Sequence, residues 1–232
     1  MHSDNRANVI LVPGAWADGS SWTRVIGPLQ ALGYRVLTAP IPMTSLSDDS
    51  AALDRTIERT SGPVILAAHA YAGAVISATA NERVRALVFI AALTPDEGET
   101  VGDVFYKGKP HELAPHLAPG ADGFIWLPDE AFKSAFAQNV SELDARLLSA
   151  VQRPISVACI QEKSPKPGWK SRPSWFLIAE EDRMINPATQ RFEAERMRAT
   201  VQSAKVDHMP LITAPKLVID LIAQAIAATP AH

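Results

Sequence analysis

Residues 64–75 read VILAAHAYAGAV, and this stretch decides the fold. It begins with a continuous apolar run, passes through small residues around His69, and continues into a second segment of small apolar residues. A continuous apolar run bounded by turn residues is typical of a strand buried on both faces, as in a parallel sheet. The stretch predicts a buried strand, a tight turn and a helix that packs closely on the sheet. A strand followed by an ordinary alanine-rich packing helix would give the same letters.

Further strands and helices alternate on both sides of this stretch. Apolar runs predict strands over 9–12, 35–38, 64–68, 84–92, 175–179 and, more weakly, 201–206. Amphipathic or small-residue patterns predict helices over 20–32, 48–60, 71–80, 187–199 and 215–228. Gly33 is a candidate stop for the first helix, and Asn186 with Pro187 a candidate start for the fourth. The alternation predicts an α/β fold with a doubly wound, mostly parallel six-stranded sheet flanked by helices.

The interval 94–172 breaks this rhythm. It holds many prolines and glycines and shows no clear strand. We expect a helical region over 130–153, in one or two pieces, and a loop over 163–173. We expect one domain over 1–232, with a core of 8–93 and 173–228 and a helical cap inserted at about 94–172. A disordered insert is the alternative, but six aromatic residues in it need burial: Phe105, Tyr106, Phe124, Trp126, Phe132 and Phe136.

Composition excludes several classes of function. The chain is 47% hydrophobic and 20% charged, with a net charge of -3, as in an ordinary globular protein. It has no basic stripe for nucleic acid and no polybasic segment for a membrane surface. The single cysteine, Cys159, cannot form an internal disulfide, and its ordinary role is that of a small buried residue. The polar start of the chain and the lack of an apolar run of about 20 residues predict a cytoplasmic, soluble protein.

The junction at residues 68–73 resembles the nucleophile elbow of the α/β-hydrolase family. That family carries Gly-x-Ser-x-Gly at a strained turn between a strand and a helix. Here Ala68, His69, Ala70, Tyr71 and Ala72 occupy the five places, with Gly73 after them. Alanine is small enough for the turn, but the methyl group of Ala70 cannot act as a nucleophile. The resemblance covers about residues 8–228 and is most like small bacterial members.

Two later segments resemble the other members of the family's triad. The resemblance assigns Asp182, after the fifth predicted strand, as the acid, and His208, after the sixth, as the general base. The order 70, 182, 208 is the order that the family uses. Glu180 and Glu181 are neighbours that could be mistaken for the acid, and a solvated loop charge or a surface histidine is the ordinary alternative for each assignment.

Residues 12–16, VPGAW, resemble the family's oxyanion loop, with Pro13 in place of its usual histidine. The resemblance implies that the backbone N–H groups of Ala15 and Tyr71 form the oxyanion hole. A simple turn explains the Pro-Gly pair equally well. Candidate walls of a substrate pocket are large apolar residues, although each is more often a core residue: Trp16, Phe105, Phe124, Trp126 and Met209.

These features together imply a serine hydrolase that acts on a carboxylic ester, lactone or related small acyl compound through an acyl-enzyme, provided that serine stands at position 70. Ala70 is explained either by replacement of a serine or by a natural, non-hydrolytic relative that binds a small ligand. A C–C lyase of hydroxynitrile-lyase type is a further alternative. His111 and His116 lack the spacing of a metal site, no phosphate or dinucleotide motif appears, and we therefore expect no cofactor or metal. The oligomeric state is left open.

Overall fold

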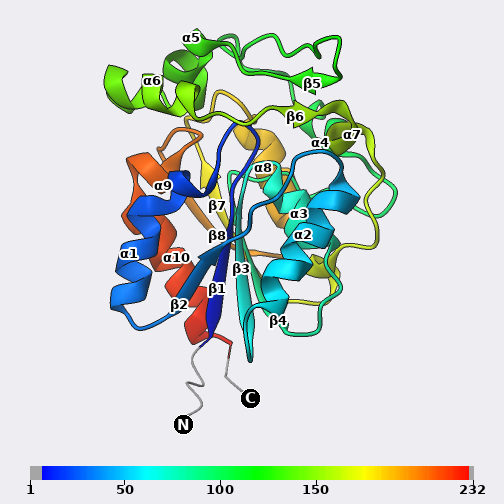
Figure 1. The fold of residues 1–232 in the computed structure, drawn as a ribbon, viewed down its shortest axis with the longest axis vertical. Helices are drawn as coiled ribbons and strands as arrows, with labels where there is room; N and C mark the ends of the chain where they lie inside the picture. Colours follow the sequence, from blue (N-terminus) through cyan, green and yellow to red (C-terminus); the bar gives the residue numbers. More distant parts are fainter. Residues whose placement is uncertain (1–6, 230–232) are drawn as a thin grey trace.

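The computed structural model describes residues 7–229, and its centre is a six-stranded sheet (Figure 1). Every neighbouring pair of strands in this sheet is parallel. The order is β2-β1-β3-β4-β7-β8, which confirms the predicted six-stranded α/β architecture. The strands are β1 Asn8–Val12, β2 Arg35–Thr38, β3 Val64–His69, β4 Val84–Ile90, β7 Ser174–Ala179 and β8 Thr200–Ala204.

Burial follows position in the sheet. The central strands β1 and β3 are buried along their whole length, since helices cover both faces. The edge strand β8 is half-exposed, which explains its weaker, alternating pattern. The fourth strand is two residues shorter than expected because Ala91 has a φ of 45°, in the left-handed region that a strand cannot accommodate.

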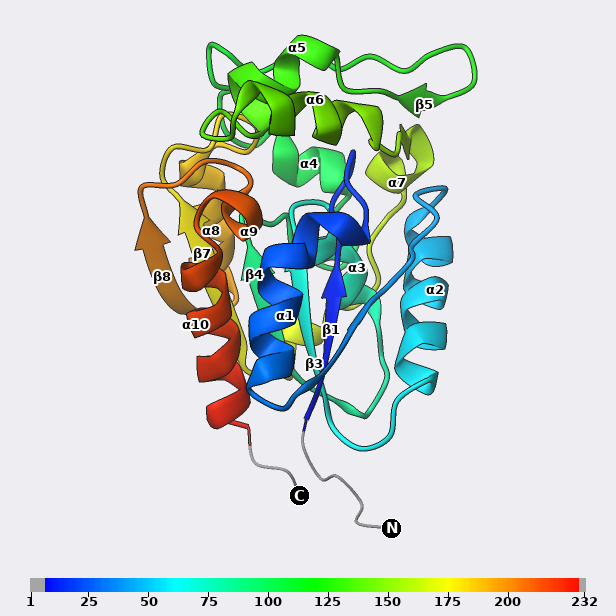
Figure 2. The same ribbon diagram turned by 60° about the vertical axis from the view of Figure 1, so that its left-hand side comes forward.

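Helices cover the two faces of the sheet. α1 (Thr23–Ala31) and α10 (Pro215–Ala227) lie together on one face, while α2 (Leu46–Glu58) and α3 (Ala72–Ala78) lie together on the other (Figures 1 and 2). α8 (Pro187–Arg196) packs on β7. The predicted helix signals are confirmed at two ends: Gly33 has a φ of 87°, and the Asn186 side chain accepts the Ala188 N–H at 2.8 Å. The first helix is preceded by a 3₁₀ turn, η1, Gly19–Trp22.

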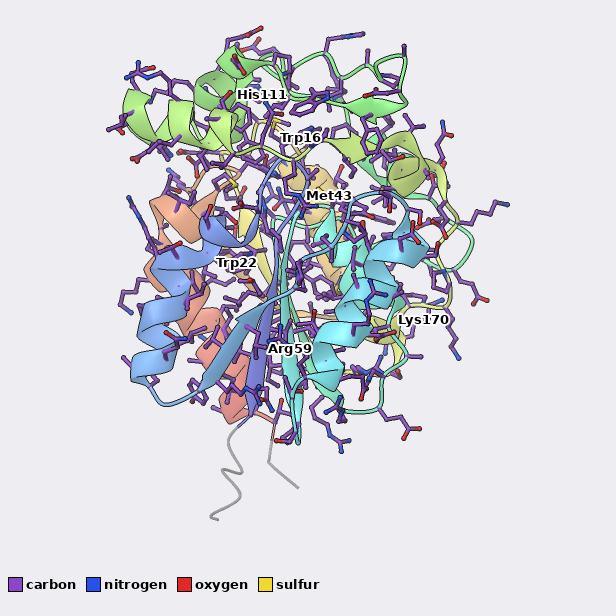
Figure 3. All side chains as sticks on the ribbon, viewed as in Figure 1. Trp16, Trp22, Met43, Arg59, His111 and Lys170 are labelled. Atoms are coloured by element: carbon purple, nitrogen blue, oxygen red, sulfur yellow. The ribbon has the colours of Figure 1, made fainter. Side chains whose placement is uncertain are left out.

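Most of the segment between β4 and β7 lies over the carboxyl ends of the parallel strands (Figure 2), whereas its last part, around Lys170, runs down beside the sheet (Figure 3). Its elements are α4 Val101–Phe105, β5 Phe124–Ile125, α5 Asp129–Ala131, the π-helix η2 Phe132–Phe136, α6 Glu142–Ala150, β6 Ile155–Ser156, α7 Val157–Gln161 and η3 Gly168–Lys170. The expectation of no strand was wrong, because β5 and β6 form a short antiparallel pair. Two-residue strands are too short to show an alternating pattern. We call residues 94–172 the cap.

The six aromatic residues named above differ in burial, and Phe105 and Phe124 are of intermediate burial. Phe132 and Phe136 are fully buried, as expected, because they pack against the core. Tyr106 and Trp126 are 63% and 54% exposed, so the expectation that all six need burial was wrong for these two. Along residues 7–229, no helix is both long enough and apolar enough to cross a membrane.

Candidate active site

Ala70 occupies the turn between β3 and α3. Its φ is 49°, a left-handed conformation that costs a non-glycine residue about 1 kcal/mol or more. Three backbone hydrogen bonds hold it there: its N–H donates to Ile90 O at 3.1 Å, and its carbonyl accepts from Gly73 and Leu93 at 3.0 and 3.1 Å. A Cβ at Gly73 would lie 2.6 Å from the Leu93 carbonyl oxygen, so only glycine lets α3 approach this closely. The turn is therefore a strained elbow.

Asp182 and His208 form a buried pair beside this elbow. His208 Nδ1 lies 2.8 Å from Asp182 Oδ2, and both side chains are almost completely buried. Asp182 sits at the carboxyl end of β7 and His208 follows β8, so the parallel sheet brings the two loops to the same edge. Among residues 7–229, His208 Nε2 has no hydrogen-bonding partner. The ring is therefore oriented by the carboxylate and keeps its second nitrogen free.

The Asp182 carboxylate is held by donors on both oxygens. Oδ1 accepts the backbone N–H groups of Met184 and Ile185 at 2.7 and 2.9 Å. Oδ2 accepts the Gln190 amide at 2.8 Å in addition to its contact with His208. Sequence reasoning missed Gln190, although its position on the following helix, eight residues after Asp182, was a usable signal.

Glu180 and Glu181 do not take part in this pair. Glu180 forms a surface ion pair with Arg191 at 2.6 Å, and Glu181 is exposed. The backbone of Glu181 is used instead, since its carbonyl accepts the Gln138 amide of the cap. The alternative assignment of the acid therefore has no geometric support.

Three further side chains hold the His208 loop, and sequence reasoning gave none of them this role. Phe136 of the cap lies with its ring centroid 5.4 Å from that of His208. Asp207 is fully buried and accepts the N–H of Asn139 at 3.1 Å, and thereby ties the loop to the cap. His69 Nε2 lies 2.7 Å from His208 O. Burial and the neighbouring His208 hold the pKa of His69 well below its usual range, so this ring is neutral and its Nε2–H donates.

The loop after β1 approaches the elbow through Gly14. A Cβ at Gly14 would lie 2.9 Å from the His69 carbonyl oxygen and 3.0 Å from Ala70 Cβ, so this approach requires glycine. The N–H groups of Ala15 and Tyr71 have no acceptor within residues 7–229. Trp16 anchors the loop to the cap: its N–H donates to Arg153 O at 3.0 Å and its Nε1–H donates to Ile125 O at 2.9 Å. Two unpaired N–H groups beside the elbow are the donors that an oxyanion hole needs.

A cavity that opens to solvent at its mouth lies between the elbow and the cap. Its wall is apolar and has no lysine, arginine or carboxylate side chain. It is lined by Ala15, Trp16, Ala70, Tyr71, Leu93, Val101, Phe105, Tyr106, Leu117, Ile125, Ile155, Ile160, Met184, Ile185 and His208. The structure thus brings Ala70 and His208 together on one cavity. Figure 3 shows Trp16 and Met43 between the sheet and the cap.

Three of the expected wall residues lie elsewhere. Successive side chains of a strand point to opposite sides, so Ile125 faces the cavity and Phe124 does not. The Trp126 side chain is directed to solvent, as its exposure indicates. Met209 is fully buried in the core rather than at the cavity wall. Trp16 and Phe105 do line the cavity.

No side-chain group in residues 7–229 has the composition of a metal site. His111 lies in the cap (Figure 3), is exposed, and accepts the Leu113 N–H at 3.0 Å through Nδ1. His116 is also in the cap and lines none of the cavity.

The comparisons with known proteins agree with this geometry. The sequence model described as the alpha/beta hydrolase family matches residues 9–221. The chain is 23% identical to the probable hydrolase R7 of Phoma sp. over 93% of this chain and 96% of the relative. It is 23% identical to methylesterase 2 of Arabidopsis thaliana over 93% and 94% of the two chains. The structure of a pyrethroid hydrolase from Sphingobium faniae JZ-2 superimposes with a TM-score of 0.81 at 21% identity, over 96% of this chain and 98% of the other.

Proposed function

Because the chain belongs to the alpha/beta hydrolase family, we propose that its site is that of an ester hydrolase in which alanine stands at the nucleophile position. One observation carries this proposal: the buried Asp182–His208 pair faces an apolar cavity beside a left-handed Ala70. A strand-to-helix elbow of this kind presents a nucleophile to a substrate. The relatives named as a methylesterase and a pyrethroid hydrolase support ester hydrolysis as the general reaction.

In the Ala70→Ser form, each group would have a defined role. His208 Nε2 takes the serine hydroxyl proton while the oxygen attacks the ester carbonyl. The N–H groups of Ala15 and Tyr71 stabilise the negative oxygen that forms. His208 returns the proton to the departing alcohol, and water then releases the acid by the reverse sequence. Asp182 keeps the imidazole in one tautomer and stabilises its charged form without accepting the proton.

The cavity wall limits the substrate. A charged acyl group would have no counter-ion there, since the wall offers no cationic or anionic side chain other than the imidazole of His208. Burying a charged group without a counter-ion costs on the order of several kcal/mol. We therefore propose an uncharged ester with an apolar acyl group as the substrate class. The proposal includes a small-molecule substrate, no cofactor and a cytoplasmic location, in which a lone buried cysteine stays reduced.

With Ala70 the chain is expected to be nearly inert, because loss of such a nucleophile costs about a million-fold in rate. Two accounts of Ala70 remain. If a serine has been replaced, the buried acid–base pair and the strained elbow are retained parts of a catalytic site. If alanine is natural, the cavity would bind an apolar ligand without cleaving it. We favour the first account, because simple ligand binding requires neither the Asp182–His208 pair nor a left-handed elbow.

The deciding experiment compares the chain with its Ala70→Ser variant on p-nitrophenyl and methyl esters of acids of increasing length. We expect Ala70→Ser to raise kcat/KM by at least about a thousand-fold, since it supplies the missing nucleophile. The control is Ala70→Gly, which alters the same turn without a hydroxyl. Adding His208→Ala should abolish the rise in kcat/KM, and adding Asp182→Asn should remove most of it.

Failure of Ala70→Ser on every ester, together with tight binding of an uncleaved ester by the Ala70 chain, would support the natural binding protein instead. A C–C lyase would give a third pattern. It would release an aldehyde and cyanide from a cyanohydrin, lose this activity in the His208→Ala variant, and leave esters intact.

A further inference from the structure

Asp49 is a buried carboxylate outside the Asp182–His208 pair. It lies in the first turn of α2 and has no solvent-exposed surface. Neighbouring Asp48 lies on the same turn and is exposed. A carboxylate at the first turn of a helix is favoured by the helix dipole, but burial is not needed for that effect. The burial of Asp49 therefore needs a further reason.

Both oxygens of Asp49 accept short hydrogen bonds from the surroundings of the active site. Oδ2 accepts the phenol of Tyr71 at 2.6 Å. Tyr71 directly follows Ala70, lines the cavity, and presents the backbone N–H assigned to the oxyanion hole. Burial and the Asp49 charge keep the pKa of Tyr71 well above its usual range, so the phenol stays protonated and acts as the donor. Tyr71 thus joins Asp49, through its phenol, to the proposed oxyanion hole, through its backbone N–H.

The other oxygen of Asp49 holds the loop before α2 through a hydrogen bond. Oδ1 accepts the N–H of Met43 at 2.6 Å, and Met43 has a left-handed φ of 61°. The Met43 carbonyl accepts the N–H of Ser156, at the end of cap strand β6, at 3.0 Å. Cys159, in the next cap helix, lies with its Sγ 3.7 Å from Asp49 Oδ2. The carboxylate is therefore joined to the elbow on one side and to the cap on the other.

The cap segment seated on Asp49 also forms part of the cavity. Ile155 and Ile160 flank Ser156 and Cys159 in the sequence, and both line the cavity. Burial raises the pKa of Asp49, and the charge of Arg153, just before this segment, acts in the opposite direction. The Arg153 carbonyl accepts the Trp16 N–H of the loop after β1. Displacement of the carboxylate would move Tyr71 and the cavity wall at Ile155 and Ile160 together.

We propose that Asp49 is a positioning residue that sets the oxyanion hole through Tyr71 and seats the cap segment 153–160 over the same cavity. This rests on the proposed ester hydrolysis. Asp49 touches no reacting atom. It holds Tyr71 through a charge-assisted bond, which is shorter and stronger than a bond between neutral groups. A small misplacement of catalytic groups can cost about a hundred-fold in rate, so a change at Asp49 should lower kcat while leaving KM nearly unchanged.

The kinetic test is made in the Ala70→Ser protein. Asp49→Asn keeps the size of the side chain but presents one acceptor and one donor, so only one of its two partners keeps its acceptor. We expect kcat to fall about 10- to 100-fold and KM to change less than about three-fold. Asp48→Asn, which removes a charge from the same turn without touching Tyr71, should leave both within about two-fold. Tyr71→Phe should reproduce the loss, and the double variant should be little worse than either single variant.

A second measurement does not depend on turnover. In the Ala70 chain labelled with ¹⁵N, Asp49→Asn and Tyr71→Phe should each shift the Tyr71 amide resonance and speed hydrogen exchange at Ser156, whereas Asp48→Asn should change neither. If Ala70→Ser proves inactive while these changes occur, the hydrolase proposal fails and the positioning role of Asp49 stands. Unchanged amide signals, or a folded Asp49→Asn enzyme with full kcat, would overturn the positioning proposal.

Discussion

Ala70 adopts a backbone conformation that its own side chain disfavours. The conformation is imposed by its surroundings: the carbonyl accepts two N–H groups, and its own N–H bonds to the end of β4. The same turn would hold serine at a similar cost, because both residues carry a Cβ. The local strain therefore belongs to the elbow rather than to alanine, and the residue at position 70 decides only whether a nucleophile is present.

Replacement of Ala70 by glycine should reveal this strain. Ala70→Gly relieves the left-handed conformation but loosens the unfolded chain, so the free energy of unfolding should change by no more than about 0.5 kcal/mol. Ala74→Gly, in the following helix, has no strain to relieve and should lose about 1 kcal/mol. Urea unfolding of the three proteins measures both values. Equal losses at the two positions would mean that the elbow is not strained.

At the scale of elements, the loop after β1 and the cap are bonded to each other beside the elbow. The loop reaches the elbow through Gly14 and is joined to the cap by both hydrogen bonds of Trp16. Trp16 itself has a left-handed φ of 59°, so this loop is bent to meet both partners. Phe136 and the Asp207–Asn139 bond join the cap to the His208 loop in the same way. The cap therefore supports both the loop after β1 and the His208 loop.

A methyl group at Gly14 should disable the oxyanion loop. In the Ala70→Ser background, Gly14→Ala would press on His69 and on position 70, and we expect kcat to fall about 100-fold as one donor moves. Gly27→Ala is the matched control, since a Cβ there meets nothing within 4 Å. Its kcat and KM should stay within about two-fold. Steady-state kinetics on one ester compares the two, and equal activities would remove Gly14 from the site.

At the scale of the whole molecule, α8 is joined to the end of β4 by a buried acid. Glu193 is fully buried, and its Oε1 accepts the Thr94 N–H at 2.6 Å. Arg196 bonds to Glu99 at 2.7 Å and to the Thr94 carbonyl at 2.6 Å. Leu93, the residue before Thr94, lines the cavity and bonds to Ala70. Burial raises the pKa of Glu193 from its usual 4.5 to about 8.

This shift predicts how stability depends on pH. Between about pH 4.5 and 8 the folded chain keeps a proton on Glu193 that the unfolded chain releases. The contribution of this proton to the free energy of unfolding is complete below pH 4.5, the usual pKa, and is lost as pH rises through about 8, the pKa in the folded chain. The loss is on the order of a few kcal/mol. Glu193→Gln, which cannot ionise, should flatten the fall in stability between pH 5 and 8.5. Denaturant unfolding across that range measures the effect.

Glu195→Gln is the control for the pH experiment, because Glu195 is an exposed carboxylate on the same helix. Its unfolding free energy should follow the parent chain at every pH. A Glu193→Gln profile with the parent's slope would mean that Glu193 is ionised in the folded protein, with Thr94 N–H and Arg196 outweighing burial.

The sequence by itself determined the alternation of strands and helices, the six strands of the sheet and the strand-to-helix junction at residues 68–73, because these depend on short-range patterns. The apolar run of β3 and the small residues after it predict a strand, a turn and a helix, and the family resemblance identifies the turn as an elbow. The family resemblance predicted Asp182 and His208, and the structure places them 2.8 Å apart. Their distance in space follows from a parallel sheet, which brings the ends of all its strands to one edge.

Only the tertiary structure decided which side chains meet across that edge. Phe136 on His208, Asp207 on the cap and Asp49 on Tyr71 join residues 22 to 72 positions apart, and no periodicity in the chain relates them. The cap also decided that Ile125 rather than Phe124 faces the cavity and that Trp126 faces solvent. Local patterns show which residues are apolar. Which other residues each of them contacts depends on how the cap packs on the sheet.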